Sequence, residues 1–223
     1  MNRRDLLAAV GATGALFAVP TLAGAAQPSQ VIMLVRHAEK PTSATAPPYG
    51  VTFDGVRDPH ALVVDGWNRA GALVELFAPA GTPMRAGLTR PTAIFATRPS
   101  SANESLRPLQ TLTPLAQRLQ ISVTQTYAFG EEAALAAGLL ATPGVSLTAW
   151  QHQHIPLITQ KLGFADLGVP THWPSHRFDM VFVFTRTGRT WSFAQVPQLV
   201  LAGDVATPLR HGGASASASG TPD

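Results

Sequence analysis

Short apolar runs alternate with amphipathic stretches along most of this chain. Val31–Val35 is an unbroken apolar run, which is typical of a strand buried on both faces. Gly66–Phe77 carries apolar side chains at helical spacing and predicts an amphipathic helix. Because strands and helices continue to alternate, the sequence predicts right-handed crossovers and a mostly parallel sheet.

The later segments extend this pattern. Three more strands are predicted at Thr92–Thr97, Ile121–Thr126 and Val145–Trp150. Helices are predicted at Ser105–Leu119, where Pro108 and Pro114 are expected to break it into pieces, at Glu131–Leu140 and at Ile155–Leu162. A hairpin is predicted at Met180–Thr185 and Thr190–Val196, on either side of a Thr-Gly turn. The expected fold is a three-layer α/β/α sandwich with a mostly parallel central sheet.

The two ends of the chain differ from the folded region between them. Residues 1–26 combine the basic pair Arg3-Arg4, a mildly apolar stretch and a small-residue cleavage site, which predicts a twin-arginine-type signal peptide. We therefore expect a periplasmic or secreted protein without a stable membrane anchor after cleavage. Residues 27–210 form the predicted domain, and the low-complexity residues 211–223 form a tail predicted to be disordered.

Composition narrows the class of protein. The hydrophobic share is 45% and the charged share is 13%, so the chain is expected to fold around a core. The formal net charge is +3 and the arginines are scattered, which gives no nucleic-acid-binding pattern. The absence of cysteine excludes disulfides.

Cations and imidazoles follow several of the predicted strands. Arg36 and His37 end the first strand, His152 follows Val145–Trp150, and Arg98 and Arg107 come after the strand at Thr92. Ligands of open α/β sheets bind outside the carboxyl ends of the strands. Arginine matches phosphate oxygens and a neutral imidazole can attack phosphorus, so this set suits a small phosphorylated substrate.

The segment LVRHAEKP resembles the signature of the histidine phosphatase superfamily, which has the phosphoglycerate-mutase-like fold. The resemblance covers most of Gln30 to Arg186 in the family's order and points to a small exported branch. Further matching segments are LVVDGWNRAGALVELF, IFATRPSSANESLRPLQTLTPLAQRLQI, LTAWQHQHIPLITQKLG and WPSHRFDMVFVFTR.

The resemblance implies roles for individual residues. It makes His37 the phosphorylated nucleophile, Arg36 and Arg107 the phosphate clamps, and His152 the second histidine of a phosphomonoesterase that needs no cofactor. Ala38 stands where the family usually has glycine, so the backbone there must accept a Cβ.

Two roles stay open at this point. The family's proton donor for the leaving group corresponds to Glu131 or Glu132, and Glu131 is favoured because it is closer to the preceding loop. Pro99–Glu104 separates Arg98 from Arg107, so Arg98 is an alternative clamp and a candidate substrate-binding residue. Glu39 is a second candidate for substrate binding, at the mouth of the pocket.

Two other functions remain as alternatives. On an extended segment, His152 and His154 would share one face and, with His172 or His176, would suit zinc or copper in an exported metal-binding protein. The same fold without catalysis would make a phosphate-binding or partner-binding module. Arg210-His211-Gly212 is not favoured as a site because no strand–helix unit follows it.

Overall fold

The computed structural model describes residues 28–43 and 45–210. The predicted signal peptide and the predicted disordered tail lie outside these residues, so both stay predictions. Within the described ranges, no helix has the length and apolar character needed to cross a membrane.

The strands and helices follow the predicted order. The strands are β1 (Gln30–Arg36), β2 (Ala93–Ala96), β3 (Val123–Thr124), β4 (Gly144–Trp150), β5 (Met180–Thr187) and β6 (Thr190–Pro197). The helices are α1 (Val64–Phe77), α2 (Arg107–Leu119), α3 (Glu132–Ala141) and α4 (Ile155–Lys161), with a 3-10 turn at Ala165–Leu167.

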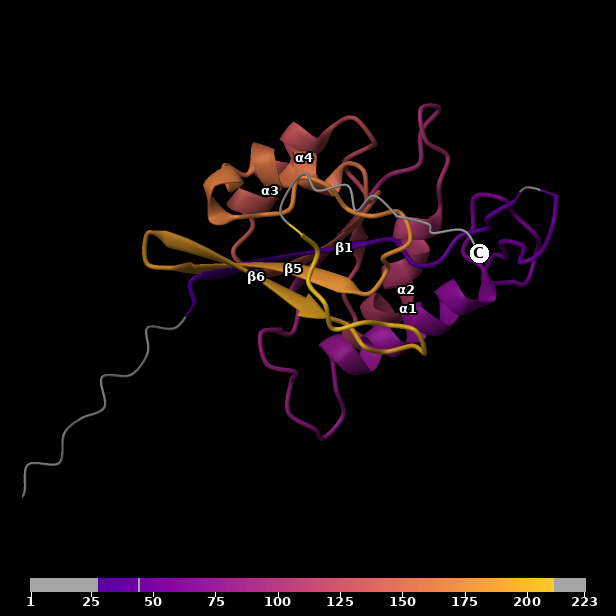
Figure 1. Ribbon diagram of the computed structural model, residues 1–223, viewed down its shortest axis with the longest axis horizontal. Helices are drawn as coiled ribbons and strands as arrows, with labels where there is room; N and C mark the ends of the chain where they lie inside the picture. Colours follow the sequence, from indigo (N-terminus) through magenta and orange to yellow (C-terminus); the bar gives the residue numbers. More distant parts are fainter. Residues whose placement is uncertain (1–27, 44, 211–223) are drawn as a thin grey trace, which may run out of the picture.

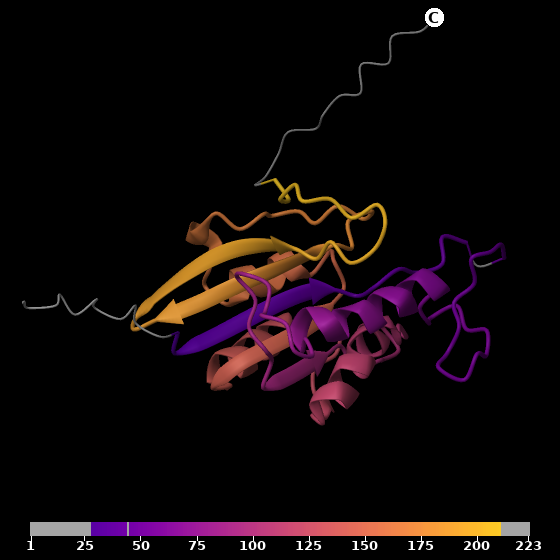
Figure 2. The same ribbon diagram turned by 90° about the horizontal axis from the view of Figure 1, so that it is seen from below.

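A six-stranded sheet with the order β3-β2-β4-β1-β5-β6 forms the middle layer. β1, β2, β3 and β4 run parallel, whereas β5 pairs antiparallel with both β1 and β6. Helices α3 and α4 lie on one face, and α1 and α2 lie on the other (Figures 1 and 2). The predicted three-layer α/β/α sandwich with a mostly parallel sheet is confirmed.

Both faces of β1 are buried, which explains its unbroken apolar sequence. Met33 and Val35 face the core beneath α1 and α2, and Ile32 and Leu34 face the core beneath α3 and α4. Successive side chains of a strand point to opposite faces, so a central strand needs apolar residues at every position. This burial holds the carboxyl end of β1 firmly in place.

Helix α2 is continuous, and the prediction that its prolines break it is wrong. Pro108 occupies the second helical position, where a backbone N–H has no partner within the helix. Pro114 lies inside the helix and removes one backbone hydrogen bond. The buried side chains of Leu112, Leu115 and Ala116 anchor the helix to the core despite this loss.

Helix α1 packs closely on the segment that follows β1. The Val63 N–H donates to the carbonyl oxygen of Glu39 at 3.2 Å. A Cβ added at Gly66 would lie 2.5 Å from the same carbonyl oxygen, so only glycine permits this approach. The Gly-x-x-Arg pattern of α1 therefore fixes the loop that carries the candidate nucleophile.

Candidate active site

The two histidine segments lie side by side at the carboxyl ends of β1 and β4. Arg36 is opposite Trp150 in the parallel register. One residue further along, the His37 N–H donates to the Trp150 carbonyl at 3.0 Å. The backbone pairing of these two strands therefore continues to the point where His37 meets Gln151 and His152.

The imidazole of His37 is buried, with 4% of the residue exposed. Its Nδ1 lies 2.7 Å from the carbonyl oxygen of Ala38. A carbonyl oxygen only accepts hydrogen bonds, so the contact places the proton on Nδ1 and the lone pair on Nε2. The ring is thus held in the tautomer that a nucleophilic Nε2 requires.

Burial is the main cause that lowers the pKa of His37 well below its ordinary value. The charge of Arg36 lowers this pKa further, the hydrogen bond to Ala38 opposes the shift, and Arg107 and His152 add smaller decreases. His37 is therefore neutral at physiological pH. Because such contributions fall with distance, Arg36, Arg107 and His152 lie near the His37 ring.

The guanidinium of Arg36 is buried and held on one side. Its Cζ lies 3.6 Å from the centre of the Phe178 ring. Its Nη1 donates to the carbonyls of Ser175 and Arg177 at 2.6 and 3.0 Å, whereas Nε and Nη2 have no hydrogen-bond partner. Burial lowers the Arg36 pKa to about 9, so the group remains a cation at neutral pH. Two oriented donors are thus left for an anion.

Arg107 and Arg98 occupy different environments. Arg107 begins α2, donates to the carbonyls of Ala61 and Pro59, and contributes to the electrostatic field at His37. Arg98 is exposed, and its Nη2 lies 3.7 Å from Oε2 of Glu131. The structure brings Arg107 near His37, while the contacts of Arg98 are with the loop that precedes α3.

This difference predicts unequal effects of two matched substitutions. We expect Arg107→Ala to lower kcat/KM for a phosphomonoester about a hundredfold, because a cation facing the transferred group is lost. Arg98→Ala should change it less than about threefold, since exposed ion pairs contribute little. Steady-state kinetics on both variants checks this expectation. The reverse order of effects would make Arg98 the second clamp.

His152 is buried beside Arg36, and its Nδ1 has no hydrogen-bond partner. Burial, followed by the charges of Arg36, Lys40 and His172, lowers the His152 pKa to about 4. Like His37, this imidazole is neutral at pH 7. Lys40 and His172 thus lie close enough to influence the site, and the sequence had linked His172 to His152 only in the metal-binding alternative.

The two low imidazole pKa values predict an unusual titration. A depressed pKa means that the charged form appears only in more acidic solution. In the NMR spectrum of protein labelled in its histidine rings, the signals of His37 and His152 should stay at their neutral positions down to about pH 5. If the His37 signals instead titrated with a midpoint near pH 6.5, the ring would not be buried in its neutral form.

The two candidate acids have different surroundings. Glu131 precedes α3, is half-exposed, and accepts a hydrogen bond from the Ala128 N–H at 2.7 Å. Glu132 is buried, and its Oε1 accepts from Trp150 Nε1 at 3.1 Å and lies 2.7 Å from His154 Nδ1. Burial would raise the Glu132 pKa, but hydrogen bonds outweigh it and hold the pKa below its ordinary value. Glu132 is fixed as a structural anion, so Glu131 is the acid with an accessible carboxyl group.

Glu39 is held by a neighbouring arginine. Its carboxylate lies 2.8 Å from Arg69 Nη2, and Arg69 also pairs with Asp204 at 2.7 Å. The Glu39 charge raises the pKa of Arg36, so it lies near the site. In this geometry, Glu39 supports the site through Arg69, and its carboxylate is engaged before any substrate binds.

The extended geometry assumed for a His152–His154 metal pair is wrong. Residues 152–154 form a turn. The His154 ring packs on Phe129, with centroids 4.0 Å apart, and binds Glu132, whereas His152 lies near the charge of Arg36. In the part of the chain that the structure describes, no group of three or more His, Cys, Asp or Glu side chains is placed to hold a metal ion.

Thr111 supports the segment after β1, although the sequence analysis gave it no role. Thr111 Oγ1 accepts a hydrogen bond from the Ala38 N–H at 2.8 Å. Ala38 is buried against Leu62 and Ala70, and among described non-glycine residues positive φ angles occur only at Gln120 and Leu199. The backbone therefore accepts alanine after His37. The Gln-Thr pair within IFATRPSSANESLRPLQTLTPLAQRLQI was the available signal for Thr111.

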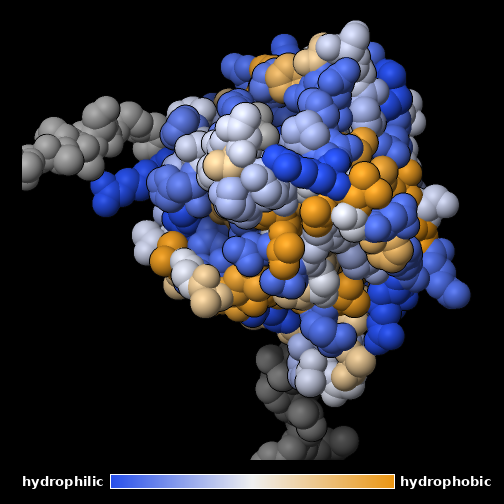
Figure 3. Space-filling view, turned by 90° about the vertical axis from the view of Figure 1, so that its right-hand side faces the viewer, coloured by the Kyte–Doolittle hydropathy of each residue, from blue (hydrophilic) through white to orange (hydrophobic). Residues whose placement is uncertain are grey.

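The carboxyl edge of the sheet forms the face of the molecule that carries the site. Figure 3 views this edge and shows hydrophilic and hydrophobic residues side by side over it. Beside Arg107, a small hollow of about 160 Å³ opens among loop residues. Its lining residues are Pro41, Thr42, Ser43, Pro59 and Arg107.

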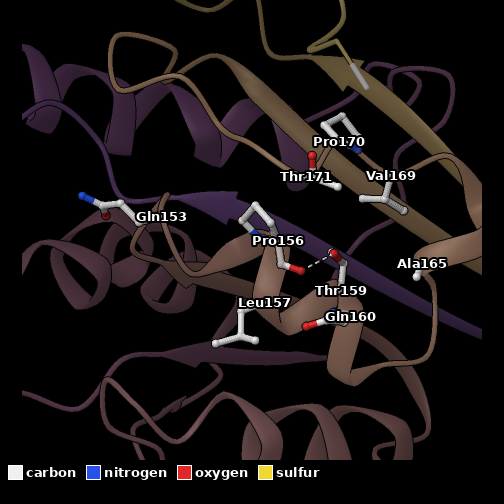
Figure 4. A pocket seen from close by; sticks show the side chains of 9 residues that line it. All are labelled: Gln153, Pro156, Leu157, Thr159, Gln160, Ala165, Val169, Pro170 and Thr171. Carbon is white, nitrogen blue, oxygen red and sulfur yellow. Dashed lines mark hydrogen bonds between the residues drawn. The ribbon is translucent and has the colours of Figure 1, made fainter. Parts of the chain in front are cut away.

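A larger hollow of about 330 Å³ lies between α4 and the loop that follows it (Figure 4). Its lining carries no charged side chain, so it does not resemble a phosphate site. The residues that line it are Gln153, Pro156, Leu157, Thr159, Gln160, Ala165, Val169, Pro170 and Thr171. The Arg-His cluster, with its unpaired guanidinium nitrogens, suits an anion better than this hollow does.

The fold and the site define a three-layer α/β protein with an arginine–histidine cluster at the carboxyl edge of its sheet. No protein-family model matches the chain, and no curated protein matches it. One solved structure with a related shape is assigned provisionally as the phosphohistidine phosphatase SixA from Agrobacterium tumefaciens. It shares 17% sequence identity and a TM-score of 0.46, and the match covers 74% of this chain and 95% of the other. This likeness is too weak to assign an activity.

Proposed function

We propose that this protein is a phosphohydrolase of the histidine phosphatase superfamily, which cleaves phosphomonoesters through a phosphohistidine on His37. The observation that carries the proposal is a buried, neutral imidazole with its Nε2 lone pair available among the groups of Arg36, Arg107 and His152. The ordered resemblance of the sequence motifs to that superfamily supports it independently.

The geometry supports a two-step transfer. In the first step, His37 Nε2 forms a bond to phosphorus while the bond from phosphorus to the leaving oxygen breaks. The Nδ1–H stays hydrogen-bonded to the Ala38 carbonyl, which stabilises the positive charge that the attack creates on the ring. In this proposal, Glu131 gives the leaving oxygen its proton.

In the second step, water attacks phosphorus and the phosphorus–nitrogen bond breaks. Glu131 takes a proton from that water, so inorganic phosphate leaves and His37 returns to its neutral form. Arg36 and Arg107 carry fixed positive charge toward the phosphoryl oxygens in both steps. Splitting the reaction in this way lowers each barrier without a cofactor.

A phosphatase assay with and without a chelator tests this chemistry. We expect the purified protein to hydrolyse a generic phosphomonoester such as p-nitrophenyl phosphate, with the same rate in excess EDTA, because arginines replace a metal as the source of positive charge. Loss of activity in EDTA that zinc restores would favour the metal-binding alternative. Phosphate binding without turnover would favour the non-catalytic alternative.

A further inference from the structure

We infer that the side-chain amide of Gln151 is a further catalytic group, whose Nε2 donates a hydrogen bond to an oxygen of the phosphoryl group transferred to His37. Neither the sequence motifs nor the resemblance assigned a role to this residue. The inference rests on the proposed function, and it names an additional contact between this chain and the substrate's phosphoryl group.

Unpaired polar atoms are concentrated at this place in the fold. Within the described ranges, seven buried side-chain nitrogen or oxygen atoms have no hydrogen-bond partner, and four of them belong to Arg36, Gln151 and His152. A buried polar group without a hydrogen-bond partner destabilises the fold. Several unpaired polar atoms at the ends of the adjacent strands β1 and β4 indicate a ligand with several acceptor oxygens.

The backbone places Gln151 beside the nucleophile. Arg36 is opposite Trp150, and the His37 N–H donates to the Trp150 carbonyl, so Gln151, the first residue after β4, lies next to His37. Gln151 is 5% exposed, and its own carbonyl accepts from the N–H groups of His154 and Ile155 at 3.0 and 3.2 Å. Its position is therefore fixed by the start of α4 as well as by the sheet.

The orientation of the amide follows from Thr97, the residue after β2. The Thr97 hydroxyl donates to Gln151 Oε1 at 3.0 Å, and Gln151 Nε2 is the end without a partner. Because the oxygen end is occupied, the amide offers its N–H groups to the cluster formed with Arg36 and His152. Thr97 is thus a positioning residue for Gln151.

A neutral amide donor suits the transition state of this transfer. Negative charge is spread over the equatorial oxygens of the phosphoryl group, and an oriented donor in a buried site stabilises it without reorganisation. The expected effect is mainly on kcat rather than on KM. Removing one such donor lowers kcat about a hundredfold in comparable sites.

The first experiment compares Gln151→Met with Gln153→Met. Gln153 is exposed two residues further along the same segment, so it is a matched control. We expect Gln151→Met to lower kcat on p-nitrophenyl phosphate about a hundredfold with little change in KM, and Gln153→Met to leave both constants unchanged. A wild-type kcat in a folded Gln151→Met variant overturns the inference while leaving the proposed function intact.

Two further variants separate donation from packing. Gln151→Glu keeps the size of the side chain but replaces the donor with a carboxylate, so it should lower kcat more than Gln151→Met does, and it serves if Gln151→Met does not fold. Thr97→Val should lower kcat about tenfold by releasing the amide, and Thr97→Ser should restore it because the hydroxyl is kept. Equal rates for Thr97→Val and Thr97→Ser overturn the assigned orientation.

A binding measurement covers the case in which the proposed function fails. If the wild-type protein shows no turnover, titration with inorganic phosphate followed by calorimetry replaces the kinetic assay. About tenfold weaker binding by Gln151→Met than by the wild type and Gln153→Met would support the amide as a phosphate donor. Equal binding by all three proteins, or no binding by any of them, overturns the inference.

Discussion

Replacement of His37 by alanine should reduce phosphomonoester turnover to the background rate, a loss of about ten-thousandfold or more. The reason is that His37 combines a neutral imidazole and adjacent cations with an Nδ1–H held by the Ala38 carbonyl, which leaves the lone pair on Nε2. Rapid alkaline quench of the wild type with a ³²P-labelled substrate should trap a phosphoenzyme that is stable in alkali and loses its label when the sample is then acidified. The His37→Ala protein should carry no such label.

Two controls make this result specific to the site. Truncation after Arg210 removes the second Arg-His string, and it should leave both the rate and the trapped intermediate unchanged. Circular dichroism should show that the His37→Ala protein is folded, since His37 is buried and its removal disturbs local packing. If the folded variant still turns over at the wild-type rate, the nucleophile is another residue and the mechanism proposed above fails.

The sequence predicted the central part of the fold well because burial leaves a clear local pattern. β1 and the carboxyl-terminal part of β4 are buried, and the segments predicted for them, Val31–Val35 and Val145–Trp150, end within about one residue of the observed strands. β3 is shorter than predicted, since it is an edge strand that pairs with β2 over Val123 and Thr124 alone. The placement of Arg36, His37 and His152 at one edge followed directly from parallel strand geometry.

The supporting contacts of the site could not be predicted in the same way. Gln151 binds Thr97 across 54 positions in the sequence, and Arg69 binds Asp204 across 135 positions. Neither pair has a spacing pattern, because partners on different elements are brought together only by the complete fold. The prediction for α2 failed for a related reason, since propensity disfavoured Pro114 but the buried face of the helix packs on the core.

The second large effect concerns stability. Arg69 is almost completely buried, and it holds the loop after β1 and the segment after β6 together through Glu39 and Asp204. Its Nη1 also donates to Gln198 Oε1 at 2.9 Å. Removing the guanidinium would leave the Asp204 carboxylate, whose side chain is 5% exposed, without its buried counter-ion. Breaking a buried ion pair from one side typically costs about 3–5 kcal/mol.

Arg69→Met should therefore lower the free energy of unfolding by about 3–5 kcal/mol at pH 7 in urea titrations, whereas Arg90→Met, at an exposed position, should change it by less than about 0.5 kcal/mol. Adding Asp204→Asn to Arg69→Met should recover part of the loss by removing the unpaired charge.

The pH dependence of this loss has a definite sign. Burial would raise the pKa of Asp204, but Arg69 and the N–H groups of Val200 and Leu201 outweigh it and hold that pKa below its ordinary value. A depressed carboxyl pKa stabilises the folded state above the unfolded pKa of about 3.9, and this contribution is lost as the pH falls through the native value. The difference in unfolding free energy between the wild type and Arg69→Met should thus be largest near pH 7 and narrow below about pH 4. A difference that stays constant from pH 7 to pH 3 would show that Arg69 stabilises the fold by packing rather than by its charge.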